Sequence, residues 1–162
     1  MAILTYTART LIAKYLVTHP LHLAIGTGKA SWATKLEPPD YEDTKLINEV
    51  GRIKLRRYVF VNDDEHGEID LPGGRSYSES ATPTRQVYCE FRLRYGEGIL
   101  VPIREVGLFA DTKIKSGLPS TQNYFTPDQI ESPGTLITLE HLDASETFTP
   151  TKTGTYGTVL SI

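Results

Sequence analysis

Hydrophobic and polar residues alternate along several stretches of the chain, most regularly over residues 86–95. The odd positions are apolar and the even positions mostly charged: Val87, Cys89, Phe91 and Leu93 alternate with Tyr88, Glu90, Arg92 and Arg94. A period of two residues is typical of a β-strand with one buried and one solvated face. The pattern therefore predicts a strand whose odd-numbered side chains enter a hydrophobic core.

Five further segments are predicted strands, because each is apolar or alternating and is bounded by turn residues. They cover residues 21–25, 51–61, 99–109, 135–142 and 155–162. Glycine-rich turns such as Gly26-Thr27-Gly28 and Gly96-Glu97-Gly98 separate the strands. Together they predict an all-β fold, an antiparallel β-sandwich in a single domain of residues 1–162. The predicted core includes Val87, Phe91, Leu93, Ile103, Leu108 or Phe109, Leu139 and Leu160.

One short N-terminal helix is predicted, at about residues 7–18. Its apolar face consists of Ala8, Leu11, Ile12, Tyr15 and Leu16, which recur at helical spacing. Thr5 or Thr7 can cap its start, and Pro20 ends it. A helix this short needs a surface to pack on. We expect it to cover the core as a lid; the alternative is a docking helix for a neighbouring subunit.

Two long segments, 62–85 and 111–134, are rich in polar residues, proline and glycine. Long loops in a compact domain are usually functional or disordered. We expect both to protrude, the first as a loop or a loose hairpin, and to become ordered only in an assembly. Tyr77, Tyr124 and Phe125 lie among their polar residues, so these three aromatic residues are the assembly-interface candidates.

Two charged residues share strand parity with apolar residues. Arg57 is in step with Ile53, Leu55, Val59 and Val61, and Glu105 is in step with Ile103 and Phe109. Because a buried charge is costly unless it is paired, we expect an Arg57–Glu105 ion pair. Two alternatives are open: Glu105 pairs with Arg52, or a β-bulge near Arg56 turns Arg57 outward. Glu49 completes the set of structural ion-pair candidates.

The overall charge of the chain is nearly balanced. Seventeen basic and 20 acidic residues give a net charge of −3, whereas a dedicated nucleic-acid binder usually carries a basic excess. The basic strand beside Tyr58 and Phe60 leaves single-strand stacking as a minor alternative. The lone cysteine, Cys89, is expected to be a buried, inert thiol. No stretch approaches the ~20 apolar residues of a membrane span, and no signal-peptide pattern opens the chain, so we expect assembly in a cytoplasm.

No motif in the sequence predicts catalysis, a cofactor or a metal. Gly26-Thr27-Gly28-Lys29 lacks the spacing of a phosphate-binding loop, and the four histidines lack a metal-ligand spacing. Asp63-Asp64-Glu65-His66 lacks the alternating ligands of a calcium loop. We therefore expect no catalytic residues, no cofactor and no enzymatic activity. A glycosidase is left open, because the sequence alone does not place carboxylate pairs in space.

Five short blocks, in this order, resemble a known protein family. They are Ile25-Gly26-Thr27-Gly28, the Leu-x-x-Glu-x-x-Arg stretch 46–52, the Ile-x-Glu-Val-Gly-Leu-Phe stretch 103–109, an apolar strand around 136–142 and a Thr-rich strand at 155–162. The family comprises small β-sandwich structural proteins of bacteriophage tails, baseplates and tail-fibre bases. Relative to its compact form, segments 62–85 and 111–134 are insertions.

The resemblance implies a virion structural protein of a phage tail, a baseplate or tail-fibre-attachment component that acts by protein–protein assembly. The alternatives are a neck or collar component, or a receptor- or carbohydrate-binding module of the tail tip. The implied partners are other tail, baseplate and fibre proteins and further copies of this chain, without a membrane or nucleic acid. The implied location is the virion, after assembly in the host cytoplasm.

Overall fold

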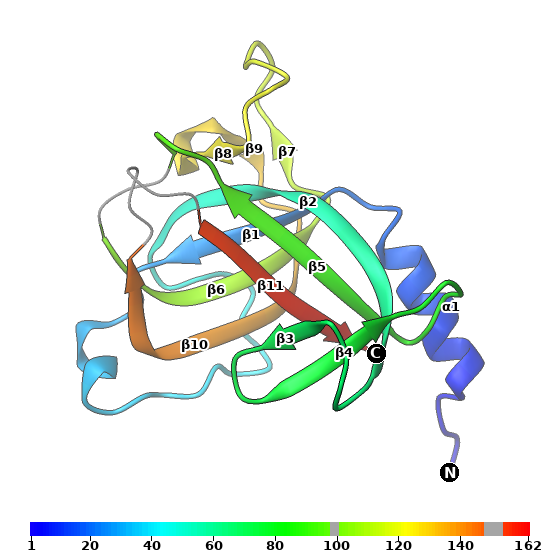
Figure 1. Cartoon of the computed structure of the whole chain (residues 1–162). Helices are drawn as coiled ribbons and strands as arrows, with labels where there is room; N and C mark the ends of the chain where they lie inside the picture. Colours follow the sequence, from blue (N-terminus) through cyan, green and yellow to red (C-terminus); the bar gives the residue numbers. More distant parts are fainter. Residues whose placement is uncertain (98–100, 148–153) are drawn as a thin grey trace. The chain divides into compact units, whose positions relative to one another are not determined.

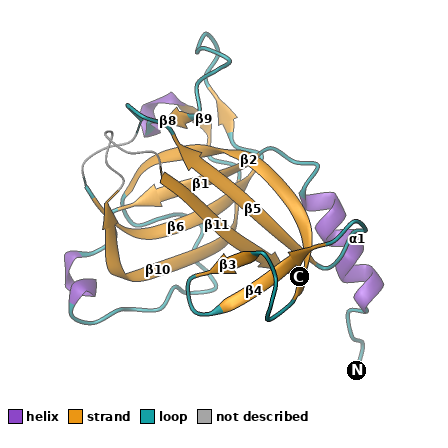
Figure 2. Cartoon of the chain, viewed as in Figure 1, coloured by secondary structure: helices purple, strands orange, loops and turns teal. Residues whose placement is uncertain are grey.

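Strands are the main regular structure of the described residues, which also contain one α-helix and two short 3₁₀ turns (Figure 2). The computed structural model describes residues 1–97, 101–147 and 154–162, and of residues 143–147 the backbone alone. The helix is α1 (Tyr6–Leu16), and the 3₁₀ turns are η1 (Ala30–Ala33) and η2 (Pro127–Gln129). The strands are β1 (Leu21–Gly26), β2 (Glu49–Asp63), β3 (Ile69–Leu71), β4 (Arg75–Glu79), β5 (Gln86–Leu93), β6 (Pro102–Ala110), β7 (Lys113–Ile114), β8 (Tyr124–Phe125), β9 (Ile130–Ser132), β10 (Thr135–Thr147) and β11 (Gly154–Ser161). The predicted all-β class, with antiparallel strands and one short N-terminal helix, is confirmed.

The described residues form two compact units, each built from segments that are far apart in the sequence. Unit 1 consists of Met1–His19, Arg56–Phe91 and Tyr156–Ile162. Unit 2 consists of Pro20–Leu55 and Arg92–Thr155. The long strand β2 contributes to both, with residues 49–55 in unit 2 and 56–63 in unit 1. The single domain expected from the chain length stays a prediction.

In unit 1, β4 lies between β2 and β3, while β5 pairs with both β2 and β11 (Figure 1). Apolar side chains from these strands form a core of Val61, Ile69, Tyr77 and Tyr88, with Val59, Leu71 and Val159 packed against it. Strand β5 is buried on both faces, contrary to the expected solvated face, since Tyr88 and Glu90 are only 8% and 7% exposed. The alternation of apolar and polar residues thus predicts the strand correctly, but it does not predict whether other parts of the protein cover the second face.

Segment 62–85 is a paired hairpin of β3 and β4 rather than an open loop. Tyr77 lies opposite Ile69 in this hairpin and opposite Asp63 of β2. Gly73 and Gly74 close the hairpin with positive φ angles of 95° and 77°. Paired strands satisfy their own backbone groups, so the hairpin alternative is confirmed. That the segment becomes ordered only in an assembly stays a prediction.

Helix α1 begins and ends close to the predicted residues, but its predicted face is turned outward. Thr5 caps the start by accepting a hydrogen bond of 3.3 Å from the backbone N–H of Ala8. Ala13 is the buried residue of the helix, whereas Leu11 and Tyr15 are 66% and 65% exposed. The expectation that Leu11 and Tyr15 cover the core as a lid is therefore wrong. Among the described residues, no helix is both long enough and apolar enough to cross a membrane.

In unit 2, β1 lies between β2 and β6, and β10 adds to the other side of β6 (Figure 1). Segment 111–134 is also more regular than expected, because it contains β7, β8, η2 and β9. Strand β8 pairs with β2 and buries both of its aromatic rings, while β7 pairs with β9. The expectation that segment 111–134 is irregular is therefore wrong, whereas its protrusion and its role in an assembly stay predictions.

The predicted core residues are buried, with one exception. Val87, Phe91, Leu93, Ile103, Leu108, Phe109 and Leu160 are each at most 5% exposed. Leu139 is only partly buried and packs against the cluster of Ala24, Leu46 and Phe109. The strand predicted at 99–109 is described from Pro102, and its first two residues, like Gly98 of the preceding turn, lie outside the described ranges.

Candidate functional site

A buried carboxylate, Glu105, joins three segments of unit 2. Its side chain projects from β6 and is 0% exposed. One carboxylate oxygen, Oε1, accepts hydrogen bonds from the backbone N–H groups of Gly28, at 3.1 Å, and Asn48, at 2.8 Å. The other oxygen, Oε2, accepts from the N–H of Ile47 at 2.9 Å. Hydrogen bonds to a charged acceptor are about twice as strong as neutral ones, so Glu105 holds the turn after β1 and the entry to β2 against β6.

The glycines of the turn after β1 make room for this carboxylate. A Cβ atom on Gly26 would lie 2.5 Å from Oε1 of Glu105. Gly28 has a φ of +53°, and a Cβ atom there would lie 2.3 Å from the ring of Trp32. The Ile-Gly-Thr-Gly block therefore leaves room for the carboxylate of Glu105.

A buried guanidinium, Arg52, forms a second centre in unit 2. Arg52 is 2% exposed, and its guanidinium contacts Glu49 twice, with Nε 2.7 Å from Oε1 and Nη2 3.1 Å from Oε2. Nη1 donates to Oγ1 of Thr112 at 2.6 Å and to the carbonyl of Pro133. The guanidinium also lies 3.8 Å from the centroid of the Phe109 ring, a cation–π distance. Arg52 therefore ties the ends of segment 111–134 to β2.

The expected Arg57–Glu105 pair is wrong, and so is the alternative of Glu105 with Arg52. The carboxylate of Glu105 accepts hydrogen bonds from backbone N–H groups instead of pairing with a cation. The positions of charged residues in the sequence do not predict such backbone partners. Arg57 is 46% exposed and bonds to Glu79 at 3.0 Å and Glu90 at 3.2 Å. The hydrogen bonds to these two carboxylates raise the pKa of Arg57, and Glu79 has the larger effect. Of the four ion-pair candidates, the structure brings together Arg52 and Glu49.

The three aromatic interface candidates are not available to a partner. Tyr77, Tyr124 and Phe125 are 2%, 9% and 6% exposed. The hydroxyl of Tyr124 donates to the carbonyl of Val50 at 2.8 Å, and burial raises the pKa of this tyrosine. The expectation fails because the polar segments around these rings fold into short strands that bury them.

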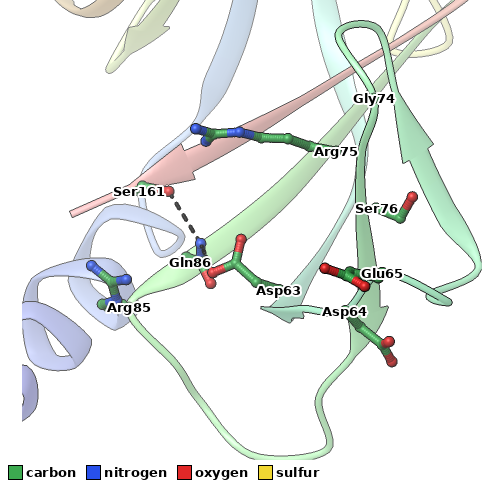
Figure 3. A pocket seen from close by; sticks show the side chains of 9 residues that line it. All are labelled: Asp63, Asp64, Glu65, Gly74, Arg75, Ser76, Arg85, Gln86 and Ser161. Atoms are coloured by element: carbon green, nitrogen blue, oxygen red, sulfur yellow. Dashed lines mark hydrogen bonds between the residues drawn. The ribbon is translucent and has the colours of Figure 1, made fainter.

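Unit 1 carries an open hollow of about 920 Å³ that is lined mainly by polar side chains (Figure 3). Its lining residues are Asp63, Asp64, Glu65, Gly74, Arg75, Ser76, Arg85, Gln86 and Ser161. The side chain of Gln86 donates to Asp63 at 3.0 Å and lies 3.5 Å from Ser161. No aromatic ring lines the hollow, although ligand pockets are usually rich in apolar and aromatic side chains. Within the described ranges, no group of three His, Cys, Asp or Glu residues is placed to hold a metal ion.

The lone thiol is buried, as expected. Cys89 is 0% exposed, and burial raises the pKa of its thiol to about 12. Because the thiolate is the nucleophile, we predict that the folded chain does not react with iodoacetamide at pH 8 over several hours. The same chain in denaturant should be labelled at once, which provides the positive control in a mass measurement. Rapid labelling of the folded chain would contradict the burial of Cys89.

A buried imidazole, His22, is expected to make the stability of unit 2 depend on pH. His22 is 5% exposed and packs edge-on to Phe125, with the ring centroids 6.0 Å apart. Burial, and then the nearby charges of Arg52 and Lys54, lower its pKa from 6.5 to about 4. Between pH 6.5 and pH 4 the unfolded chain therefore binds a proton at this residue that the folded chain does not. The free energy of unfolding should fall as the pH decreases through this window.

We predict that replacing His22 with Gln reduces this acid sensitivity. The wild type should lose up to about 3 kcal/mol more than the variant between pH 6.5 and pH 4, from the size of the pKa change. Urea denaturation at several pH values measures the difference. The exposed His66 replaced with Gln is the matched control and should leave the pH profile unchanged. Parallel profiles for wild type and His22→Gln would contradict the prediction.

The buried charges of unit 2, Glu105 and Arg52, bind groups of the chain itself and hold its segments together. Large apolar side chains are exposed on the surface of the chain. Both features are typical of a structural protein in an assembly. Over residues 1–162 the chain matches the family model described as baseplate wedge 3 tail fiber network component, and it belongs to that family. A search among curated proteins gave no match.

Membership of this family establishes the general function. The chain is a structural protein of the phage virion, and it takes part in the baseplate and tail-fibre network. The resemblance to phage tail and baseplate proteins is thereby confirmed at the level of the family. Its partners include other baseplate and tail-fibre components.

Proposed function

We propose that this chain is a non-catalytic joint that fixes tail-fibre components to a baseplate wedge by protein–protein contacts alone. The observation that carries the proposal is that Glu105 and Arg52, the most deeply buried charges described, are saturated by groups of the chain itself. Catalytic groups have to face a substrate, and these two face backbone amides, a carboxylate, a hydroxyl and a carbonyl. Their arrangement stabilises a rigid scaffold.

We also propose that the Ile-Gly-Thr-Gly, Leu-x-x-Glu-x-x-Arg and Ile-x-Glu-Val-Gly-Leu-Phe blocks are the structural signature of this scaffold. The first and third blocks meet at the hydrogen bond between Gly28 and Glu105. The second block supplies Ile47 and Asn48 as donors to the same carboxylate, and it contains the Glu49–Arg52 pair. Three segments that are far apart in the sequence thus meet at the carboxylate of Glu105, which accounts for the residue types of their glycines and of Glu105.

The proposal places assembly in the host cytoplasm, with more than one copy of the chain in each particle. A baseplate joint of this kind should bind no host saccharide and hydrolyse no cell-wall polymer. The polar hollow of unit 1, which lacks aromatic rings for stacking on a sugar, supports the joint over a carbohydrate-binding module.

A phage that lacks this gene product provides the test. We expect particles made without it to have baseplates that lack fibres, and plasmid-borne wild-type chain to restore them. The purified chain should release no reducing sugar from peptidoglycan or capsular polysaccharide and should bind neither on a glycan array. Fully fibred, infectious particles without the chain, or measurable turnover of either polymer, would refute the proposal. Quantitative mass spectrometry of the particles gives the copy number, and a single copy would refute the oligomer.

A further inference from the structure

Exposed apolar side chains gather at the start of the chain. Twelve large hydrophobic residues of the described chain are exposed, and seven of them lie within residues 1–15. These seven are Met1, Ile3, Leu4, Tyr6, Leu11, Ile12 and Tyr15. Such a concentration in one segment differs from the single, scattered apolar residues of an ordinary surface, and it marks an interaction site.

On α1 the outward residues have the spacing of a helix that binds in a groove. Ala8, Leu11, Ile12 and Tyr15 occupy positions i, i+3, i+4 and i+7, which place their side chains on one face. Ala13, on the opposite side, is buried in the protein. The helix therefore has two apolar faces, one on its own unit and one facing outward, and we call the second the docking face.

The charges of the segment that carries the docking face are all positive. No Asp or Glu occurs before Glu37, whereas Arg9 and Lys14 carry positive charge. Arg9 is held beside the helix by a hydrogen bond of 3.3 Å from Nε to the carbonyl of Leu4, and Lys14 is exposed. A complementary surface would have an apolar groove with carboxylates at its border.

A second copy of α1 does not meet this requirement. The helix has 11 residues and is about 16 Å long at 1.5 Å per residue, so two copies laid along each other would bring their Arg9 and Lys14 side chains together. No acidic residue of the same segment would offset the repulsion. Charge thus disfavours pairing of two copies through α1, and membership of the baseplate and tail-fibre network supplies other proteins as the partner.

We propose that the docking face of α1 binds an apolar groove bordered by Asp and Glu residues on another component of the baseplate and tail-fibre network. This inference rests on the proposed function and specifies its contact surface. Leu11 and Tyr15 enter the groove, and Lys14 pairs with a carboxylate at its border.

Site-specific photo-cross-linking in assembled particles tests the partner. Phage lacking the gene are complemented with full-length chain that carries benzoylphenylalanine at Leu11, or at Tyr95, an equally exposed control position. Irradiation should link position 11 to an apolar segment of another virion protein that contains Asp or Glu, and position 95 should not give this product. A product between two copies of the chain would overturn the proposal. So would strong binding of α1 to vesicles of phosphatidylcholine and phosphatidylserine without any protein product.

Incorporation of variants provides the quantitative test. We expect the Leu11→Ser/Tyr15→Ser double variant to reduce the amount of chain in purified particles by about tenfold, as expected for anchor residues, while Tyr95→Ser leaves it unchanged. Lys14→Glu should reduce incorporation and Lys14→Arg should not. Thermal melts of the isolated variants should match the wild type, since these side chains are exposed. If the double variant is incorporated as well as the wild type, the docking-face proposal is refuted but the proposed function as a joint is not. If the wild-type chain is absent from particles, the proposed function itself is refuted.

Discussion

Replacing Glu105 with Gln should lower the free energy of unfolding by about 3 kcal/mol, because the substitution removes the charge that three backbone N–H groups share. The amide has one acceptor oxygen for three donors, and its own NH₂ group would lie against an N–H. The N–H groups of Gly28, Ile47 and Asn48 would then lack full partners at a buried side chain. Denaturation in urea, followed by tryptophan fluorescence, measures the loss.

The matched control for Glu105 is Glu131, an exposed carboxylate on β9. Glu131→Gln should change stability by less than about 0.5 kcal/mol, as most exposed substitutions do. Hydrogen exchange should also rise at the amides of Gly28, Ile47 and Asn48 in Glu105→Gln and remain low in the control. A loss below about 1 kcal/mol for Glu105→Gln would mean that the carboxylate does not hold these segments together.

The second large effect is expected at Arg52. Arg52→Met should cost about 3–5 kcal/mol, since it leaves Glu49 without its cation and removes the donor to Thr112 and Pro133. Adding Glu49→Gln should restore part of the loss, because the second change removes the unpaired charge. Urea denaturation of the two single variants and the double variant gives the coupling energy.

The surface pair of Arg57 and Glu79 is a control within the same protein. Both side chains are more than 40% exposed, so solvent screens their attraction. Arg57→Met and Glu79→Gln should each cost less than about 1 kcal/mol and combine almost additively. Equal coupling energies for the Arg52–Glu49 and Arg57–Glu79 pairs would contradict the conclusion that Arg52 contributes more to stability than Arg57.

The strands and most of the core could be predicted because they depend on local patterns. The alternation around Phe91 and the apolar run ending at Phe109 are consequences of strand geometry, which holds wherever the strand packs. The partners of buried charges could not be predicted in the same way. Glu105 is stabilised by N–H groups 57 to 77 residues away in the sequence, and backbone donors are the same in every residue type except proline.

The helix and the aromatic residues show a second limit of the sequence. The spacing of Leu11 and Tyr15 predicts that they share a face of α1. The same spacing occurs whether that face packs on the protein's own core or is exposed to a partner, so it does not predict which way the face points. Tyr77 and Phe125 stand among polar residues, but pairing of β4 and β8 with β2 buries their rings. Strand pairs of two to five residues are too short to give a periodic signal of their own.

The composition of unit 1 has a consequence for the time at which the chain can fold. Residues 1–19 and 156–162 belong to the same unit, and β11 pairs with β5 about 65 residues earlier in the chain. At ribosomal rates of about 5–20 residues per second, α1 leaves the ribosome some 7–30 seconds before β11 does. During this interval the helix lacks the last strand of its unit. A prematurely terminated chain would therefore lack the last strand of the unit to which α1 belongs.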